Sequence, residues 1–300
     1  MTVSVLVPSS LTREAEDKRE ATRKLGYVAR AATIFRADRL LVFPDREAEG
    51  RFDGGFVNTV LSYAATPPYL RKEVWGQRDE LEFAGVLPPL RATSQTGSES
   101  NGSGSSRRRQ GIVTEVGPDR RVRVNCGLQH PISLVVPPEM EVEEGERVTV
   151  RISSRRPVRA KLTDDPLPGL SVEQTDLSAA LGREDAGVRI AASRFGEELT
   201  VGRLETLAGR IERDGMTVAF GAPERGLPDI LGVDPSTVIA ASSGRDGDKR
   251  GDAEADADVE PGDPETGFDL WLNTVPQQGS ETVRTEEAMF ATLAPLSLRA

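Results

Sequence analysis

The sequence has one cysteine, Cys126, and one histidine, His130, among its 300 residues. A lone cysteine excludes an intrachain disulfide framework and a cysteine-rich zinc site. A lone histidine excludes most histidine-based metal centres and catalytic pairs, and we predict no metal site. We expect Cys126 to pack as a small hydrophobe, because no basic residue stands beside it. His130 precedes Pro131, which is typical of a turn.

Long apolar runs are also missing. No segment approaches the roughly 18 consecutive apolar residues that a transmembrane helix needs. The N-terminal sequence MTVSVLVPSS lacks a basic segment followed by a long apolar stretch, so we expect no secretory signal, a cytoplasmic protein and no membrane partner. The length is enough for one large domain or two ordinary ones.

Lysine is scarce, and the charge is unevenly placed. Only five of the 38 basic residues are lysine, and 48 acidic residues bring the net charge to −10, which favours a surface adapted to high salt. Residues 242–265 hold nine acids and three bases, whereas residues 107–161 hold twelve bases and seven acids. The total charge argues against a nucleic-acid partner, but the local basic excess makes that partner a candidate again.

Strand and helix patterns alternate at both ends of the chain, which indicates an α/β fold with a parallel sheet. We expect strands at Val3–Val7, Leu40–Phe43, Gly187–Ala192, Met216–Phe220, Val238–Ala241 and Phe268–Leu272. We expect helices at Thr12–Phe35, Phe56–Ala65, Pro67–Lys72 and Thr200–Arg213, and from Thr285 onward.

The apolar period changes to two in the middle of the chain. Short alternating runs at 111–116, 121–125, 132–136 and 147–152 predict a small β-barrel of the OB type, with arginines on its solvent face. We therefore expect residues 1–92 and 163–300 to form two parts of an α/β domain. The barrel at 107–162 is then an insertion that follows a Ser/Gly-rich linker at 93–106, and residues 242–265 form an acidic loop.

Two loops follow predicted strands and precede helices, where α/β proteins place their ligand sites. One is GAPERG at 221–226, and the other is NTVPQQGS at 273–280. Their glycines permit positive φ angles, and backbone amides at a helix start can hold polar groups. Both loops could equally be ordinary tight connections. Neither matches a known phosphate-binding fingerprint, so support for a nucleotide site is weak.

The resemblance to a known family rests on longer motifs. RVNCG at 123–127, GAPERG, FDLWLNTVPQQGS at 268–280 and TVRTEEA at 282–288 resemble SPOUT-class RNA methyltransferases. Together with YLRK at 69–72 and LEFAGVLPPL at 81–90, they are similar to the archaeal and eukaryotic branch that methylates uridine N3 and carries an OB-like insertion. This resemblance covers nearly the whole chain, apart from the linker and the acidic segment.

The resemblance implies a trefoil-knotted fold, a homodimer, and S-adenosyl-L-methionine bound in the knot. The knot would be formed by the two loops and the stretch around Ala240–Ser242. Mapped onto this sequence, the cofactor-binding residues are Phe220, Gly221, Glu224, Gly226, Leu272, Asn273, Pro276, Gln278 and Gly279.

Methyl transfer to uridine N3 requires the loss of a proton and the stabilisation of an anionic base. The candidates for catalytic roles are Arg284, Glu224 and Glu286. Arg284 could instead form an ion pair with Glu287 or with a partner subunit, and Glu286 could serve the helix dipole. Arg189 could contact cofactor or RNA, or pair with a neighbouring acid.

Basic residues could grip the phosphates of an RNA, or could simply balance nearby acids on a solvated face. The residues that we expect to contact RNA are Arg71, Lys72, Arg107, Arg108, Arg109, Arg121, Arg123 and Arg225. Tyr69 could stack on a base or pack in a core.

The leading hypothesis is an S-adenosylmethionine-dependent methyltransferase that acts on a uridine of ribosomal RNA. The alternative is a non-catalytic RNA-binding or ribosome-assembly protein that keeps the same fold. A third and weaker hypothesis is a nucleotide-binding regulator that uses only the α/β loops.

Overall fold

The computed structural model describes residues 2–46, 52, 54–90, 107–155, 157–238 and 266–298, with the backbone alone for Arg107 and Arg155. These residues form two compact units. The sheet unit comprises Met1–Leu61, Phe83–Pro88 and Val172–Ala300, and the barrel unit comprises Ser62–Glu82 and Pro89–Ser171. The expected linker, the acidic loop and the stretch Ala240–Ser242 lie outside the described residues, and the expected domain boundaries stay a prediction.

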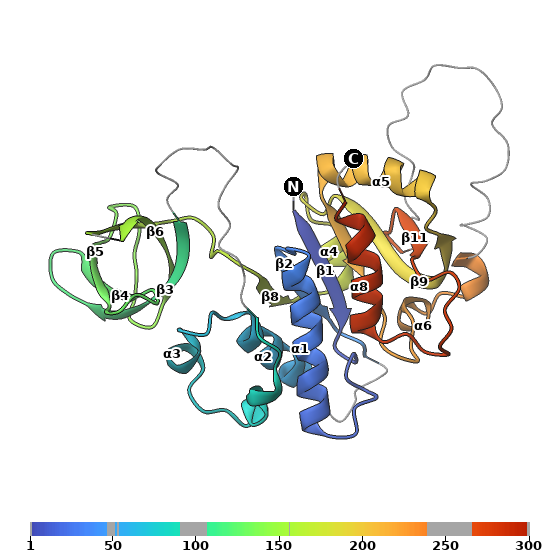
Figure 1. The fold of residues 1–300 in the computed structure, drawn as a ribbon, viewed down its shortest axis with the longest axis horizontal. Coiled ribbons are helices and arrows are strands. Elements are labelled where there is room, and N and C mark those ends of the chain that lie inside the picture. The colour runs from blue at the N-terminus through green and yellow to red at the C-terminus, as the bar shows by residue number, and fades with distance from the viewer. Residues whose placement is uncertain are drawn as a thin grey trace, which may run out of the picture. The chain divides into compact units, whose positions relative to one another are not determined.

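The sheet unit is built on a six-stranded sheet with the order β11-β9-β10-β1-β2-β8 (Figure 1). β11, β9, β10, β1 and β2 pair in parallel, so the predicted α/β class with a parallel sheet is confirmed. The strands are β1 (Val3–Pro8), β2 (Arg39–Phe43), β8 (Ser171–Gln174), β9 (Val188–Glu198), β10 (Met216–Ala219) and β11 (Leu270–Asn273). β1 and β10 are buried along their whole length, as expected for central strands covered on both faces.

Helices connect and cover the strands. They are α1 (Lys18–Ile34), α2 (Gly54–Ala65), η2 (Ala84–Val86), α4 (Leu177–Leu181), α5 (Val201–Asp214), α6 (Leu227–Leu231) and α8 (Thr285–Leu296). α1 and α8 pack side by side against each other (Figure 1). No helix in the described ranges is both long and apolar enough to cross a membrane.

The barrel unit contains a second, antiparallel sheet with the order β5-β4-β3-β6-β7. Its strands are β3 (Arg107–Val116), β4 (Arg121–Asn125), β5 (Ile132–Val135), β6 (Arg147–Arg155) and β7 (Val158–Thr163). The outer strands β5 and β7 also approach each other, so the sheet is nearly closed. Along β4 the valines are buried and the arginines exposed, which confirms the predicted alternation. Cys126 is fully buried in this core, as predicted.

A helical segment belongs to the barrel unit as well. It contains α3 (Arg71–Trp75) and η1 (Asp79–Leu81). The hydroxyl of Tyr69 donates to the carbonyl oxygen of Gln110 at 2.9 Å, and the amide of Asn125 donates to the carboxylate of Glu73 at 2.9 Å. These side-chain contacts attach the segment to β3 and β4.

Several predicted elements are wrong in extent or type; the strand expected at Gly187–Ala192, for instance, continues as β9 to Glu198. α1 begins at Lys18 and not at Thr12, because the side chain of Asp17 accepts a hydrogen bond from the amide of Glu20 and caps the helix. The helix expected from Pro67 begins only at Arg71, after a turn. Val238, the first residue of an expected strand, is helical, and the remainder of that strand lies outside the described residues. β7 and β8 were not predicted.

One glycine shows how closely the sheet and its helices approach. Gly215 ends α5 at φ +81°, and a Cβ at this position would lie 2.4 Å from the carbonyl oxygen of Thr2. We expect Gly215→Ala to lower the free energy of unfolding by about 1–3 kcal/mol, because both the positive φ and the contact oppose a side chain. Urea denaturation in concentrated KCl measures this change.

Gly209, in the exposed interior of the same helix, is the matched control because a Cβ there meets nothing within 4 Å. Gly209→Ala should raise stability by about 0.5–1 kcal/mol, since alanine is the better helix former. Equal effects of the two substitutions would contradict the argument.

Candidate functional site

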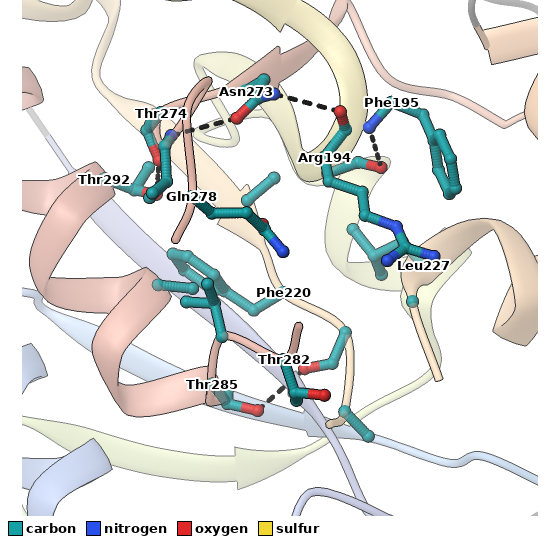
Figure 2. Close-up of a pocket in the computed structure, with 18 of the residues that line it drawn as sticks. Arg194, Phe195, Phe220, Leu227, Asn273, Thr274, Gln278, Thr282, Thr285 and Thr292 are labelled. Atoms are coloured by element: carbon teal, nitrogen blue, oxygen red, sulfur yellow. Dashed lines mark hydrogen bonds between the residues drawn. The ribbon is translucent and has the colours of Figure 1, made fainter. Parts of the chain in front are cut away.

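A cavity lies in the sheet unit beside the middle of β9 and the carboxyl ends of β10 and β11. Parallel strands present their carboxyl ends at one edge of the sheet, and the loops that follow them meet there. Five segments line the cavity: residues 192–195 of β9, the loop after β10 with the start of α6, the loop after β11, residues 281–285, and α8. Figure 2 shows side chains from these segments around one space.

The loop after β10 is the predicted GAPERG segment, and it turns sharply. The backbones of Ala222 and Arg225 exchange hydrogen bonds of 2.9 and 3.2 Å. Glu224 lies inside that turn at φ +58°, a conformation that non-glycine residues rarely adopt. A Cβ on Gly221 would come within 2.9 Å of the Cα of Gly226, so the two ends of the loop touch. The prediction that glycines here permit close backbone approach is confirmed for Gly221.

A buried ion pair fixes this loop to the neighbouring strands. The guanidinium of Arg225 lies 3.1–3.3 Å from the carboxylate of Asp45, which is 1% exposed. The same carboxylate accepts a 2.6 Å hydrogen bond from the hydroxyl of Ser10. The backbone amide of Asp45 donates to the hydroxyl of Ser9 at 3.0 Å. Residues that follow β1, β2 and β10 are thereby joined through one carboxylate.

A bulge in β9 forms one wall of this cavity, and this wall was not predicted from the sequence. Ala191 pairs with Trp271 of β11, but the next paired residues are Glu197 and Leu272, so residues 192–196 have no partner on β11. A Cβ on Gly196 would lie 2.5 Å from the backbone of Trp271, so only glycine fits this close approach. The bulge carries Ala192, Ser193, Arg194 and Phe195 to the cavity.

The loop after β11 is the predicted NTVPQQGS segment, and polar side chains hold it in place. The amide nitrogen of Asn273 donates to the carbonyl oxygen of Arg194 at 3.0 Å, and its oxygen accepts from the amide of Val275 at 3.0 Å (Figure 2). The hydroxyl groups of Thr274 and Thr292 are 2.8 Å apart. The loop is therefore bonded to β9 on one side and to α8 on the other.

The start of α8 is joined to the loop after β10. The hydroxyl of Thr285 donates to the carbonyl oxygen of Gly221 at 2.9 Å. The backbone amide of Arg284 donates to the carboxylate of Glu287 at 2.9 Å, which caps the helix. Thr285 and Ala288, one turn apart on α8, face the cavity.

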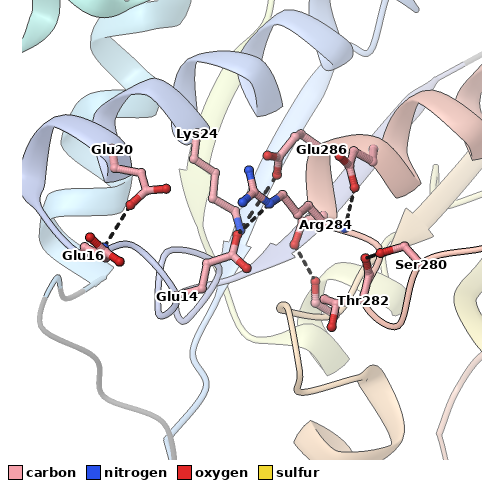
Figure 3. A network of polar contacts seen from close by, with 11 residues as sticks. Glu14, Glu16, Glu20, Lys24, Ser280, Thr282, Arg284 and Glu286 are labelled. Atoms are coloured by element: carbon pink, nitrogen blue, oxygen red, sulfur yellow. Dashed lines mark hydrogen bonds and ion pairs between the residues drawn. The ribbon is translucent and has the colours of Figure 1, made fainter.

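A second cavity lies between α1 and the start of α8. It is lined by Glu14, Ala15, Glu20, Arg23, Lys24, Tyr27, Arg284 and Glu286. The ammonium of Lys24, 5% exposed, contacts the carboxylate of Glu14 and lies 3.9 Å from that of Glu286 (Figure 3). Nε of Arg284 lies 3.6 Å from Glu14. Burial raises the pKa of the Glu286 carboxyl above its ordinary value, although the charge of Lys24 opposes this.

Residues 2–296 match the model of a protein family described as "Putative RNA methyltransferase". The chain belongs to this family of RNA methyltransferases. It is 66% identical to an uncharacterized protein of Haloarcula marismortui over 99% of both chains, and 65% identical to one of Halobacterium salinarum, again over 99% of both. It is also 29% identical to the human 28S rRNA (uridine-N(3))-methyltransferase, over 98% of this chain and 77% of the human protein.

The structure places most, but not all, of the nine expected cofactor-binding residues along the first cavity. Seven of the nine line the first cavity: Phe220, Gly221, Glu224, Gly226, Leu272, Asn273 and Gln278. Pro276 and Gly279 do not line it. The residues of β9, together with Thr274, Thr282, Thr285 and Ala288, line it without having been predicted.

The three expected catalytic residues fall into two groups. Glu224 lines the first cavity, whereas Arg284 and Glu286 line the second. Arg284 lies near Glu14, which was not among the acids expected to pair with it. Arg189 forms an ion pair with Asp269, in which Nη2 lies 2.6 Å from a carboxylate oxygen. Of the two roles expected for Arg189, the structure therefore shows the pairing with a neighbouring acid.

The expected RNA-contacting residues also differ in their surroundings. Arg71 donates to the carbonyl oxygens of Thr66 and Ala64 at the end of α2, and Arg225 is paired with Asp45. In the barrel unit, Arg109 lies over the ring of Tyr69, 5.0 Å from its centre. The side chain of Arg107 lies outside the described residues. Four of the expected residues are largely accessible on this unit: Lys72, Arg108, Arg121 and Arg123.

We expect Asp45→Ala to lower the free energy of unfolding by about 3–5 kcal/mol, because it leaves the guanidinium of Arg225 without its carboxylate in a partly buried position. Urea denaturation in concentrated KCl measures the change. Asp214→Ala is the matched control, since Asp214 and Arg213 form an exposed pair, 41% and 64% accessible. That pair should contribute less than about 1 kcal/mol. A similarly small loss for Asp45→Ala would show that the buried pair does not hold the loop.

Proposed function

We propose that this protein is an S-adenosylmethionine-dependent methyltransferase that modifies N3 of a uridine in ribosomal RNA. The observation that carries the proposal is the first cavity, which is built from the two loops whose sequences resemble the methyltransferase motifs. The named activity of the human relative supports the choice of uridine N3 and of ribosomal RNA. Membership in an RNA methyltransferase family favours this function over a binding protein without turnover.

The lining of the first cavity fits S-adenosylmethionine chemically. Phe195, Val275 and Val283, which are only partly buried, offer apolar surface for a purine ring. Glu224 and Glu281 bring carboxylates to a cavity whose ligand would carry a sulfonium and an ammonium group. The guanidinium of Arg194, exposed at the bulge, suits the carboxylate of the methionine part.

When bound, the cofactor supplies an activated methyl group, so the chain has three tasks: to position the base, to exclude water and to manage one proton. The hydrogen bonds of Asn273 and Thr285 hold the loops around the cavity in one arrangement. N3 would have to lose its proton to accept a methyl group, so the chain must place a proton acceptor close to N3. We assign the role of proton acceptor to the carboxylates of Glu286 and Glu224. The positive charges of Arg284 and Lys24 would stabilise the anionic base.

We also propose the finer features that the family resemblance implies. These are a trefoil knot through the loops after β10 and β11, an OB-type barrel inserted at 107–162, and a homodimer. The exposed basic residues of the barrel unit, among them Lys72, Arg121 and Arg123, would hold the RNA backbone. The acid-rich, lysine-poor composition fits a saline cytoplasm, because two close relatives come from halophilic archaea.

A cavity-filling substitution tests the cofactor assignment. Ala288 faces the first cavity from α8, and we expect Ala288→Leu to weaken S-adenosylmethionine binding at least about tenfold by occupying ligand space. Calorimetric titration in concentrated KCl measures the affinity. Ala294→Leu adds the same side chain at an exposed position of the same helix and should bind as the wild type does. Failure of the wild-type protein to bind the cofactor would overturn the proposed function.

The nucleoside profile of ribosomal RNA tests the reaction itself. Deleting the gene should remove one N3-methyluridine from ribosomal RNA, as measured by mass spectrometry, and the purified enzyme with S-adenosylmethionine should restore it. An unchanged profile would favour a role in RNA binding or ribosome assembly without methyl transfer.

A further inference from the structure

The helical segment of the barrel unit carries a cluster of aromatic rings and cations that lines neither cavity. The rings of Tyr63 and Trp75 meet nearly edge to face, with their centres 6.3 Å apart. The guanidinium of Arg71 lies over the ring of Tyr63, 4.8 Å from its centre. The guanidinium of Arg78 lies over the ring of Trp75, 5.3 Å from its centre. We refer to these four side chains as the Trp75 cluster.

Hydrogen bonds fix the orientation of the Trp75 ring. Its Nε1 donates to the hydroxyl of Thr66 at 2.9 Å, and that hydroxyl donates to the carbonyl oxygen of Ser62 at 2.8 Å. Thr66 is 1% exposed, whereas Trp75 is only partly buried. One edge of the indole is therefore anchored inside the unit while the ring reaches the surface, as a binding platform requires.

The two arginines of the cluster differ in what their donors contact. Nε and Nη2 of Arg71 donate to the carbonyl oxygens of Thr66 and Ala64, both at 3.0 Å, and burial lowers the pKa of this guanidinium. Arg78 is exposed, and its side chain has no hydrogen-bond or ion-pair partner in the part of the chain that the structure describes. Its N–H groups and its outer face are therefore open to a ligand.

The charges around Arg78 do not make this segment a generally basic surface. Residues 62–82 hold three cations and four acids. Lys72 is exposed and lies three residues before Trp75 on α3, so the two share one face of that helix. The carboxylate of Glu73 accepts from the amide of Asn125 at 2.9 and 3.0 Å, which turns this acid toward β4. Attraction by charge is therefore weak here, and a ligand would need contact with the stacked groups.

We infer that the Trp75 cluster is a stacking site for one unpaired base of the RNA substrate, with the base against the guanidinium of Arg78 and an adjacent phosphate at Lys72. This inference rests on the proposed function, which makes RNA the partner. Proteins bind unpaired bases by stacking them on aromatic rings and on guanidinium planes, whereas the bases of a duplex are already stacked on each other. The base held here is a second base of the RNA, distinct from the uridine that accepts the methyl group.

A stacking site suits a protein that works in concentrated salt. Salt weakens every contact between a cation and a phosphate, because the phosphate's counterions must be released into a solution already rich in ions. Stacking of a base on a ring or a guanidinium does not depend on that release. The contribution of Arg78 and Trp75 to RNA binding should therefore persist at salt concentrations where the contribution of exposed lysines and arginines fades.

RNA binding by the full-length protein tests the inference. Fluorescence anisotropy measures the affinity for a labelled single-stranded RNA of about ten nucleotides and mixed sequence, in KCl from about 1 M to about 3 M. We expect Arg78→Ala to weaken binding about tenfold throughout this range, because one stacked base is lost. Arg213→Ala removes the same charge at another exposed position, 64% accessible, and should bind as the wild type does.

Three further variants separate stacking from charge. Arg78→Lys keeps the charge but not the planar group, so it should weaken binding nearly as much as Arg78→Ala. Trp75→Leu removes the ring beneath the guanidinium and should weaken binding about tenfold without changing the salt dependence. Lys72→Ala should instead lower the slope of log affinity against log KCl concentration by about 0.7, the value for one phosphate on a single strand. Thermal unfolding confirms that each variant is folded.

A duplex of the same RNA strand should bind more weakly than the single strand, because its bases are not free to stack on the protein. Equal binding of duplex and single strand would overturn the inference. So would wild-type affinity of Arg78→Lys, which would show that this residue acts only as a charge, or a wild-type protein that binds neither RNA.

Calorimetry with S-adenosylhomocysteine separates this inference from the proposed function. The Arg78 variants should bind that ligand as the wild type does, since Arg78 lines neither cavity. If the ligand binds and both Arg78 variants also bind RNA as the wild type does, the inference is wrong and the proposed function stands. If the ligand does not bind but Arg78→Ala and Arg78→Lys both weaken RNA binding, the proposed function fails and the stacking site stands in an RNA-binding protein.

Discussion

The carboxylate of Asp45 is the contact on which the geometry of the first cavity depends. It is buried, it pairs with Arg225, and it accepts the hydroxyl hydrogen of Ser10. A buried charge is stable only when it is paired and hydrogen-bonded, and here the carboxylate and its two partners come from segments that follow three different strands. The loop that holds Glu224 in a rare backbone conformation is thereby fixed to the sheet.

The other walls of the first cavity also depend on hydrogen-bond partners for their polar groups. β10 and β11 end at the cavity, so the backbone groups of the loops that follow them need partners other than a sheet ladder. Asn273 and Thr285 supply such partners across the loops, and the β9 bulge places Arg194 where it accepts from Asn273. The result is a preorganised cavity whose apolar and charged sides face one ligand space.

The second cavity shows how two helices can build a polar site. α1 contributes Lys24 and the turn before α1 contributes Glu14, while the start of α8 contributes Arg284 and Glu286. Because α1 and α8 pack together, these charges are partly removed from water, and each depends on the others for compensation.

The sequence alone determined the parallel α/β class, the alternating barrel strands and the two loops, because hydrophobic period and turn residues are local properties. It also determined the family, through motifs that are contiguous in the chain. Only the tertiary structure decided that Arg225 pairs with Asp45, 180 residues away, and that Arg284 and Glu286 lie with Lys24 apart from Glu224. Spacing along the chain carries no information on such partners, since they are set by which strands and helices pack together in three dimensions.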